Sequence, residues 1–143
     1  AQAAAVNQQF ELIIVDATDS TEPSANLWND DFFAHLAHCL TDDGVCLDSD
    51  ILINGSCTLL SRDLHGEGLR DIKRAQKFFP YLQTYQSKIP LFPGGYFALF
   101  LYSKDGHDYA KPYRDFNGVH YNPALHQAAF ALPSWWQKLF DDL

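Results

Sequence analysis

The apolar run Leu12–Val15, which ends abruptly at an aspartate, is the feature that most constrains the fold of this chain. The run is short, rich in β-branched residues and followed by turn-forming residues, a pattern typical of a strand buried on both faces. In an open parallel sheet, ligands bind beyond the carboxyl ends of such strands. The sequence therefore predicts that Asp16 and Asp19, which follow the run, lie where chemistry usually takes place.

The spacing of these two aspartates has a functional and a structural interpretation. Two carboxylates at the rim of a cleft favour a cation, or an amine that has to lose a proton before it reacts. Alternatively, Asp16 caps the strand and Asp19 is a turn residue, because aspartate is common after strands for its own hydrogen bonding. On this stretch alone, both interpretations stay open.

The rest of the chain alternates helical and extended patterns. In order, these predict a helix from Asn29 or Asp30 to about Leu40 with a turn at Asp42–Gly44, and a second strand that starts with Val45–Leu47 and either ends there or extends towards Ile53. They then predict a helix over Leu64–Phe79, strands over Tyr81–Ile89 and Tyr96–Ser103, a short helix from Asn122 to Phe130 and a last helix from Ser134. The last two strands are joined by too short a link for a parallel crossover, so they should form an antiparallel pair. This layout is α/β, and its thin sheet suggests the second half of a larger doubly wound sheet.

Composition indicates which classes of protein and of binding partner are compatible with this chain. The 143 residues, 47% of them hydrophobic, are enough for one domain with a core. The net charge of −8 argues against nucleic acid and membrane as partners and agrees with a cationic substrate. Three irregularly spaced cysteines form neither a disulfide framework nor a metal-binding pair, which suits a reducing cytoplasm. We expect no signal peptide and no membrane span.

Other polar residues offer weaker candidates for a site. His35 and Cys39 lie one helical turn apart, a spacing that can bind metal, but no third ligand follows at a suitable distance. A solvated helix flank is therefore favoured, and we expect no metal. Asp48 and Asp50 should follow the second strand, where they either add negative charge to the same cleft or serve as turn residues.

The glycine-containing link between the last two strands should lie at the same sheet edge as Asp16. Its residues Phe92, Pro93 and Gly94 form either a simple hairpin turn or an aromatic and backbone wall of the cleft. The sequence contains no dinucleotide-binding glycine motif and no P-loop, so a glycine loop for a nucleotide-like ligand would lie outside this chain.

Taken together, several stretches resemble the polyamine aminopropyltransferases, the spermidine synthase family. Residues 10–19, FELIIVDATD, resemble the family's strand that ends in an acid, two small residues and a second acid. Residues 26–33 are similar to its segment SLFTEEFY, residues 89–95 to its loop IPTYPSG, and residues 121–133 to its tail YYNPxxHxAAFxLP. These motifs occur in the family's order over nearly the whole chain.

The resemblance covers only the C-terminal half of that family. It implies that residues 1–143 form the C-terminal part of a spermidine-synthase-like catalytic domain, with a Rossmann-like sheet of the class I methyltransferase type and helices on both faces. The N-terminal β-domain and the nucleoside-binding half would lie outside this chain. Alone, residues 1–143 should leave the edge of the strand Leu12–Val15 open and its apolar face partly exposed, and such an edge invites pairing with another chain. We therefore expect a homo-oligomer, or association with that other half.

The activity that the resemblance implies is aminopropyl transfer from decarboxylated S-adenosylmethionine, a co-substrate, to a diamine such as putrescine. The products are spermidine or a related polyamine and methylthioadenosine, with no further cofactor. Asp16 matches the family's catalytic acid and would be the base that deprotonates the amine. Asp19 matches the acid that holds a substrate amine as an ion pair. Substrate-binding roles are also expected for Asp48, Phe92, Pro93 and Gly94.

Two departures from the family pattern concern the choice of amine. Residues 20–23, Ser-Thr-Glu-Pro, replace the usual Pro, aliphatic residue, Gly and Pro, and Phe92 replaces a tyrosine whose hydroxyl would meet the amine. Two alternatives therefore stay open. One is a non-catalytic relative that binds polyamine or a partner chain, and the other is a methyltransferase of the same fold.

Overall fold

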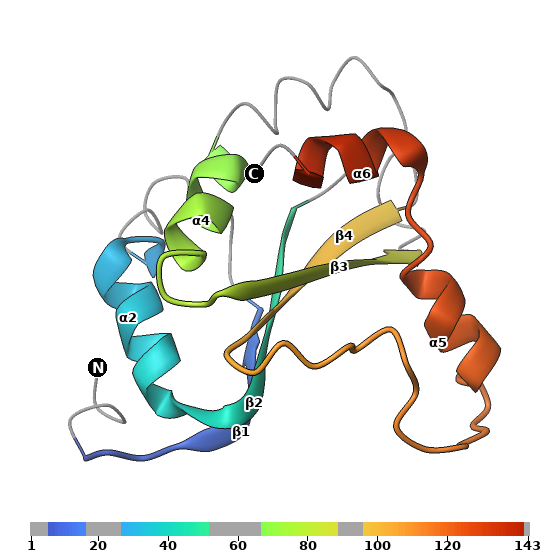
Figure 1. Cartoon of the computed structure of the whole chain (residues 1–143), viewed down its shortest axis with the longest axis horizontal. Helices are drawn as coiled ribbons and strands as arrows, with labels where there is room; N and C mark the ends of the chain where they lie inside the picture. Colours follow the sequence, from blue (N-terminus) through green and yellow to red (C-terminus); the bar gives the residue numbers. More distant parts are fainter. Residues whose placement is uncertain (1–5, 17–26, 52–66, 89–95, 142–143) are drawn as a thin grey trace.

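A computed structural model describes residues 6–16, 27–51, 67–88 and 96–141, which form a mixed four-stranded sheet with helices (Figure 1). The elements are β1 (Phe10–Val15), α2 (Asp30–Cys39), β2 (Leu40–Ile51), α4 (Glu67–Ala75), β3 (Tyr81–Lys88), β4 (Tyr96–Ser103), α5 (Pro123–Ala129) and α6 (Ser134–Asp141). The strand order is β1-β2-β4-β3, with β1 parallel to β2 and the other pairs antiparallel. The predicted α/β layout and its antiparallel last pair are confirmed. None of the helices in the described part is both long and apolar enough to cross a membrane.

The sequence-based assignment was wrong at residues 42–44, which were expected to form a turn. The structure ends α2 at Cys39 and begins β2 directly at Leu40, so these residues lie inside a strand. The register shifts there, because Phe10 pairs with Leu40 while Leu12 pairs with Val45. Gly44 fits this irregularity because a Cβ at its position would lie only 3.0 Å from the carbonyl oxygen of Glu11.

The hydrophobic core lies on one face of the sheet, between the strands and the helices α2, α4 and α6. Its buried members come from β1, β2, β4, the three helices and the segments beside them: Val15, Trp28, Phe33, Leu40, Cys46, Ile72, Ala75, Phe79, Ala98, Phe100, Tyr102 and Trp136. Aromatic rings join the elements, with centroids 5.5 Å apart for Phe79 and Tyr102 and 5.6 Å for Phe100 and Phe140. Because Val15 belongs to this core, the carboxyl end of β1 is fixed by packing.

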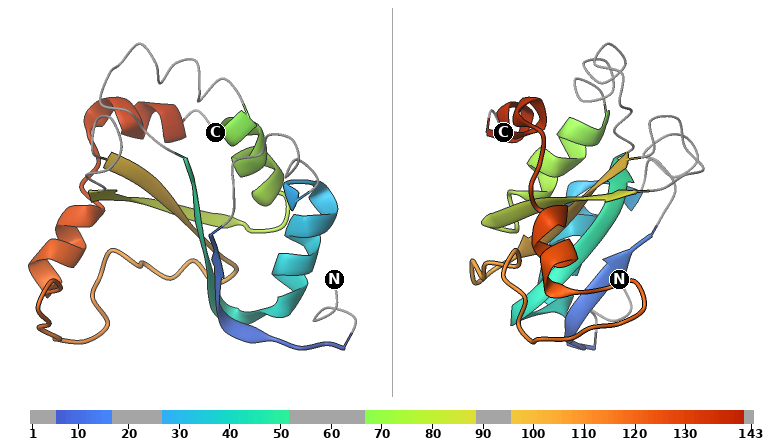
Figure 2. Two further views of the ribbon diagram at one scale, coloured as in Figure 1. Left: turned by 180° about the vertical axis from the view of Figure 1, so that it is seen from behind. Right: turned by 90° about the vertical axis from the view of Figure 1, so that its right-hand side faces the viewer.

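The opposite face of the sheet carries α5 and the chain that leads to it, so helices lie on both faces as predicted. The ring of Phe130, at the end of α5, lies 5.5 Å from that of Tyr85 on β3. The Gln83 side chain donates a hydrogen bond to the carbonyl of His107 (2.8 Å) and accepts one from the amide of Tyr109 (2.9 Å). Figure 2 shows α5 at the end of the molecule far from α2 and α4.

Strand β1 is buried on one face only in the described part of the chain, although its apolar run is typical of a strand buried on both faces. Its side chains alternate, because Val15 is buried in the core while Leu12 and Ile14 are 54% and 60% exposed. The physical reason is its position, since within the described residues β1 lies at the end of the sheet and pairs only with β2. A continuous apolar run does not by itself show which of its faces the same chain covers.

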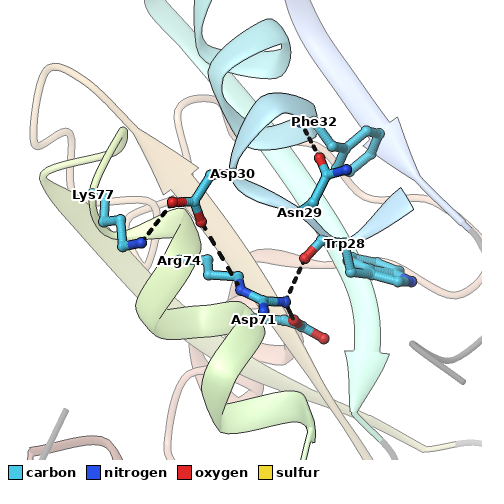
Figure 3. A network of polar contacts seen from close by, with 7 residues as sticks. All are labelled: Trp28, Asn29, Asp30, Phe32, Asp71, Arg74 and Lys77. Carbon is cyan, nitrogen blue, oxygen red and sulfur yellow. Dashed lines mark hydrogen bonds and ion pairs between the residues drawn. The ribbon is translucent and has the colours of Figure 1, made fainter. Parts of the chain in front are cut away.

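A polar network joins α2 to α4 beside the core (Figure 3). The Arg74 guanidinium donates through Nη1 to the backbone carbonyl of Trp28 (2.7 Å) and to Oδ1 of Asp71 (3.0 Å). Lys77 donates to Asp30 across the same gap (2.7 Å). Trp28 is only 1% exposed and stands where the chain enters α2. The network therefore holds Trp28 and the start of α2 against α4.

The two basic residues of this network should contribute unequally to stability. Arg74→Ala should lower the free energy of unfolding by about 2 kcal/mol, because it removes a charge-assisted hydrogen bond and the partner of a buried carboxylate. Lys77→Ala should stay within about 0.5 kcal/mol, because the Lys77–Asp30 pair is exposed to solvent. Denaturant unfolding of the two variants measures the difference, and equal losses would contradict the proposed anchoring by Arg74.

Candidate active site

Asp16 directly follows β1 and is exposed to solvent. The residue before it, Val15, is 8% exposed and pairs with Asp48 in the parallel β1–β2 ladder. Backbone pairing and core packing thus hold the strand up to the residue that carries the carboxylate. The structure places Asp16 at the carboxyl edge of the sheet, where the sequence predicted it.

Several strand ends meet at this same edge. β1 and β2 are parallel and both end here, at Val15 and Ile51. Ile51 lies beside Ala98 near the start of β4, and Lys88 at the end of β3 pairs with Tyr96. Residues 15, 51, 88 and 96 therefore lie at one edge of the sheet.

Four of the predicted site residues lie outside the described part of the chain: Asp19, Phe92, Pro93 and Gly94. Their attachment points are described, and these belong to the edge that carries Asp16. The functional roles given to these residues stay predictions.

Asp48 occupies a different place from the one expected. It was predicted to follow the second strand, but β2 continues to Ile51, and Asp48 lies within it with 4% of its surface exposed. Cys46 and Asp48 are two residues apart and so share a face of the strand. Burial, and to a smaller extent the charge of Asp48, raises the pKa of the Cys46 thiol to about 12. Asp48 is thus a buried carboxylate beside the end of β1, and its role in substrate binding stays a prediction.

The pair considered as metal ligands, His35 and Cys39, lies on α2. Cys39 is 7% exposed and packs with the core, whereas His35 is exposed on the same helix. Over the described ranges, no group of three or more His, Cys, Asp or Glu side chains is gathered.

Some residues whose contacts join the elements around the site were not predicted from the sequence. Asp71 and Arg74 are three residues apart on α4, a spacing that favours pairing and could have been noticed. The second acceptor of Arg74, the carbonyl of Trp28, is a backbone atom 46 positions away that no sequence pattern marks. His126 of α5 also contacts a backbone atom that no sequence pattern marks. Its Nε2 lies 2.7 Å from the carbonyl oxygen of Tyr109.

Comparisons with known proteins agree on one family. The family model of the spermine/spermidine synthase domain matches residues 1–111. A polyamine aminopropyltransferase of Alkaliphilus metalliredigens (strain QYMF) is 31% identical over 137 residues, which are 89% of this chain and 45% of the relative. That of Clostridioides difficile (strain 630) is 30% identical over 144 residues, 95% of this chain and 48% of the relative. The chain spans about half the length of these curated relatives.

Solved structures show the same fold. Spermidine synthase from Thermotoga maritima has a TM-score of 0.70 at 23% identity, covering 99% of this chain and 47% of that one. A spermidine synthase in complex with the transition-state analogue AdoDATO has a TM-score of 0.72 at 23% identity, covering 100% and 50%. The Rossmann-like, methyltransferase-type sheet expected from the sequence is confirmed.

The raised pKa of Cys46 predicts an unreactive thiol. With a pKa of about 12 instead of 9.0, the thiolate fraction at pH 8 falls about a thousandfold, and the thiolate is the reactive form. Cys46 in the folded chain should therefore resist iodoacetamide at pH 8, and urea-unfolded protein should be alkylated readily. Mass spectrometry of the Cys46 peptide measures both rates, and similar rates would contradict the buried, protonated state.

Proposed function

Because this chain belongs to the spermine/spermidine synthase family, we propose that, as part of a longer polypeptide, it transfers an aminopropyl group. The donor is decarboxylated S-adenosylmethionine, and the acceptor is a diamine such as putrescine. The products are spermidine or a related polyamine and methylthioadenosine. The observation that carries this proposal is the position of Asp16, an exposed carboxylate directly beyond the buried end of a parallel strand.

The reaction needs a base at this position. A protonated amine is not nucleophilic, so a carboxylate oxygen of Asp16 accepts a proton from it. The amine nitrogen then forms a bond to the methylene carbon beside the sulfonium. The carbon–sulfur bond breaks, its electron pair goes to sulfur, and a neutral thioether leaves. Because a sulfonium is already a good leaving group, deprotonation and positioning are most of the catalytic task.

Binding of the diamine is assigned to groups attached to the same edge. Asp19 forms an ion pair with a substrate ammonium, and Phe92, Pro93 and Gly94 line the amine site. Asp48 contributes negative charge from within β2. The acidic chain, with a net charge of −8, supports the attraction of a polycation to this region. The AdoDATO complex of the structurally similar spermidine synthase supports the choice of donor.

The location and assembly of the protein follow as further parts of the proposal. A reducing cytoplasm is supported by Cys39 and Cys46, which are free thiols. We propose that the active form is a homo-oligomer, or that this chain associates with the other half of the synthase, which holds the sulfonium nucleoside. The proposal is supported by the share of the curated relatives, about half, that this chain spans.

A non-catalytic, polyamine-binding relative is the second candidate. Residues 20–23 and Phe92 depart from the family pattern in the segments that would contact the amine, and this favours a changed amine preference or loss of turnover. A methyltransferase of the same fold is disfavoured by the Asp16 and Asp19 pair, which suits a cationic amine. The two experiments that follow separate these candidates.

The first experiment concerns the base. In the longer polypeptide, Asp16→Asn should keep the fold and lower kcat by at least about 10²-fold, as expected when a general base is lost. Asp141→Asn, at an exposed position on α6, is the matched control and should leave kcat unchanged. Turnover is followed by the formation of methylthioadenosine. An Asp16→Asn variant with wild-type turnover would remove this residue from the mechanism.

The second experiment concerns the charge of the acceptor. Asp19→Ala should weaken binding of the diamine more than binding of the sulfonium nucleoside, because only the diamine loses an ion pair. Asp115→Ala changes the net charge equally at an exposed position outside the proposed site. Isothermal titration calorimetry of both ligands measures the two affinities. Equal losses for the two ligands, or equal effects of the two variants, would count against the assignment of Asp19.

A further inference from the structure

An exposed asparagine–glycine pair lies in the long connection between β4 and α5 (Figure 1). Asn117 and Gly118 are both exposed, and neither belongs to a helix or strand. The Asn117 side chain makes no hydrogen bond to another described residue. Asparagine before glycine is the pair most prone to spontaneous deamidation, because glycine has no side chain to hinder the approach of its backbone nitrogen.

Deamidation joins two atoms of these adjacent residues. The backbone nitrogen of Gly118 loses its proton and attacks Cγ of Asn117, forming a new carbon–nitrogen bond that closes a five-membered succinimide ring. The bond from Cγ to the side-chain nitrogen breaks, and ammonia leaves. Water then adds to one of the two ring carbonyls and opens the ring. The product is aspartate, or isoaspartate, in which the main chain continues through the former side-chain carbon.

Two other described asparagines are poorly placed for this reaction. Asn29 and Asn122 cap helices, and their Oδ1 atoms accept hydrogen bonds of 2.9 and 2.8 Å from backbone amides, which would have to break first. Asn122 is also followed by proline, which has no N–H to lose. Within the described ranges, Asn117 alone precedes a glycine.

The turn around Asn117 restrains the reaction without preventing it. The amide of Gly118 donates a hydrogen bond to the carbonyl of Tyr121 (2.8 Å), and this bond must open before the nitrogen loses its proton. Opening an exposed turn outside any helix or strand costs much less free energy than unfolding the protein. We therefore expect the folded chain to react more slowly than the unfolded chain, but still to react.

The same turn positions the start of α5. The Tyr121 hydroxyl lies 3.3 Å from Nδ1 of His126, whose Nε2 lies 2.7 Å from the carbonyl oxygen of Tyr109. The residue after Tyr121 is Asn122, the cap of α5. Isoaspartate adds one atom to the main chain at residue 117 and so changes the length of the turn that delivers these contacts.

We propose that Asn117 is a site of spontaneous deamidation, and that its isoaspartyl product weakens the attachment of α5 to the rest of the fold. The modification places one additional negative charge and one additional main-chain atom beside the hydrogen bond that closes the turn. The inference does not depend on aminopropyl transfer, because it rests on the exposure and contacts of this turn.

Peptide mapping of the longer polypeptide tests the site. Folded protein is incubated at neutral pH beside urea-unfolded protein, and mass spectrometry quantifies the peptides of Asn117, Asn29 and Asn122. We expect folded protein to deamidate at Asn117 more slowly than in urea and much faster than at the two capping asparagines. The peptide of Asn54, which precedes a glycine outside the described residues, is quantified separately. An Asn117 that reacts only in urea, or no faster than the caps, would overturn the inference.

Two variants test the chemical route. A Cβ at residue 118 would lie 3.1 Å from the ring of Phe116, which is 60% exposed and free to move aside. Gly118→Ala should therefore fold and slow the reaction several-fold, because the Cβ hinders ring closure. Asn117→Gln keeps an amide but needs a less favourable six-membered ring, so it should also react slowly. An unchanged rate in either variant would rule out attack by the Gly118 nitrogen.

Hydrogen exchange tests the effect on α5. In protein enriched in isoaspartate, the amides of Leu125 and His126, which donate to Asn122, should exchange faster than in fresh protein. Asn117→Asp is the matched control, because it adds the same charge without lengthening the main chain, and it should exchange as fresh protein does. Unchanged exchange in the isoaspartyl protein, or equal acceleration in Asn117→Asp, would overturn the proposed effect on α5.

Discussion

The parallel pairing of β1 with β2 is the interaction on which the position of the candidate site depends. A parallel pair needs a crossover, and α2 supplies it while covering one face of the sheet. Because the two strands run in the same direction, both deliver their carboxyl ends to one edge. The antiparallel β4 and β3 then bring residues 88 and 96 back to that edge. The directions of the four strands thus bring residues 15, 51, 88 and 96, which are far apart in the sequence, to the same edge.

The two faces of the sheet are covered to different extents. On the face of α2, α4 and α6, aromatic residues such as Phe100 and Tyr102 are fully buried. On the other face, α5 covers β3, while Leu12 and Ile14 of β1 stay exposed. Full burial of a side chain of this size contributes roughly 1.5–3 kcal/mol, so the exposed face forgoes several kcal/mol that a covering partner would supply.

Sequence patterns predicted the elements well because their signals are local. The run of apolar and aromatic residues Tyr96–Ser103 and the Asn122-Pro123 pair each specify an element without reference to the rest of the chain. The failures arise where tertiary contacts decide. The acids and glycine at 42–44 read as a turn, but pairing with β1 draws them into β2 with a shift in register. The same extension of β2 buries Asp48, which the sequence placed at the rim.

Of the candidate site, the position of Asp16 was the part that could be predicted from the sequence. Asp16 could be located because it ends a recognisable strand, and the strand's direction fixes the edge. The contact of Arg74 with the Trp28 carbonyl could not, because a backbone acceptor has no residue signature. The partial exposure of the apolar face of β1 could also be predicted, because a run typical of a strand buried on both faces stands in a sheet too thin to cover it.

The strand that leads to Asp16 also carries the exposed side chains Leu12 and Ile14, so the position of the proposed base depends on the packing of β1. A general base works only when it is held close to the proton that it removes, and misplacement by about 1 Å can cost about 10²-fold in rate. A strand paired on one side is free to twist and fray at its outer edge, whereas a strand paired on both sides is held by two ladders. For β1, the core contacts of Val15 and the ladder with β2 hold the backbone that leads to Asp16.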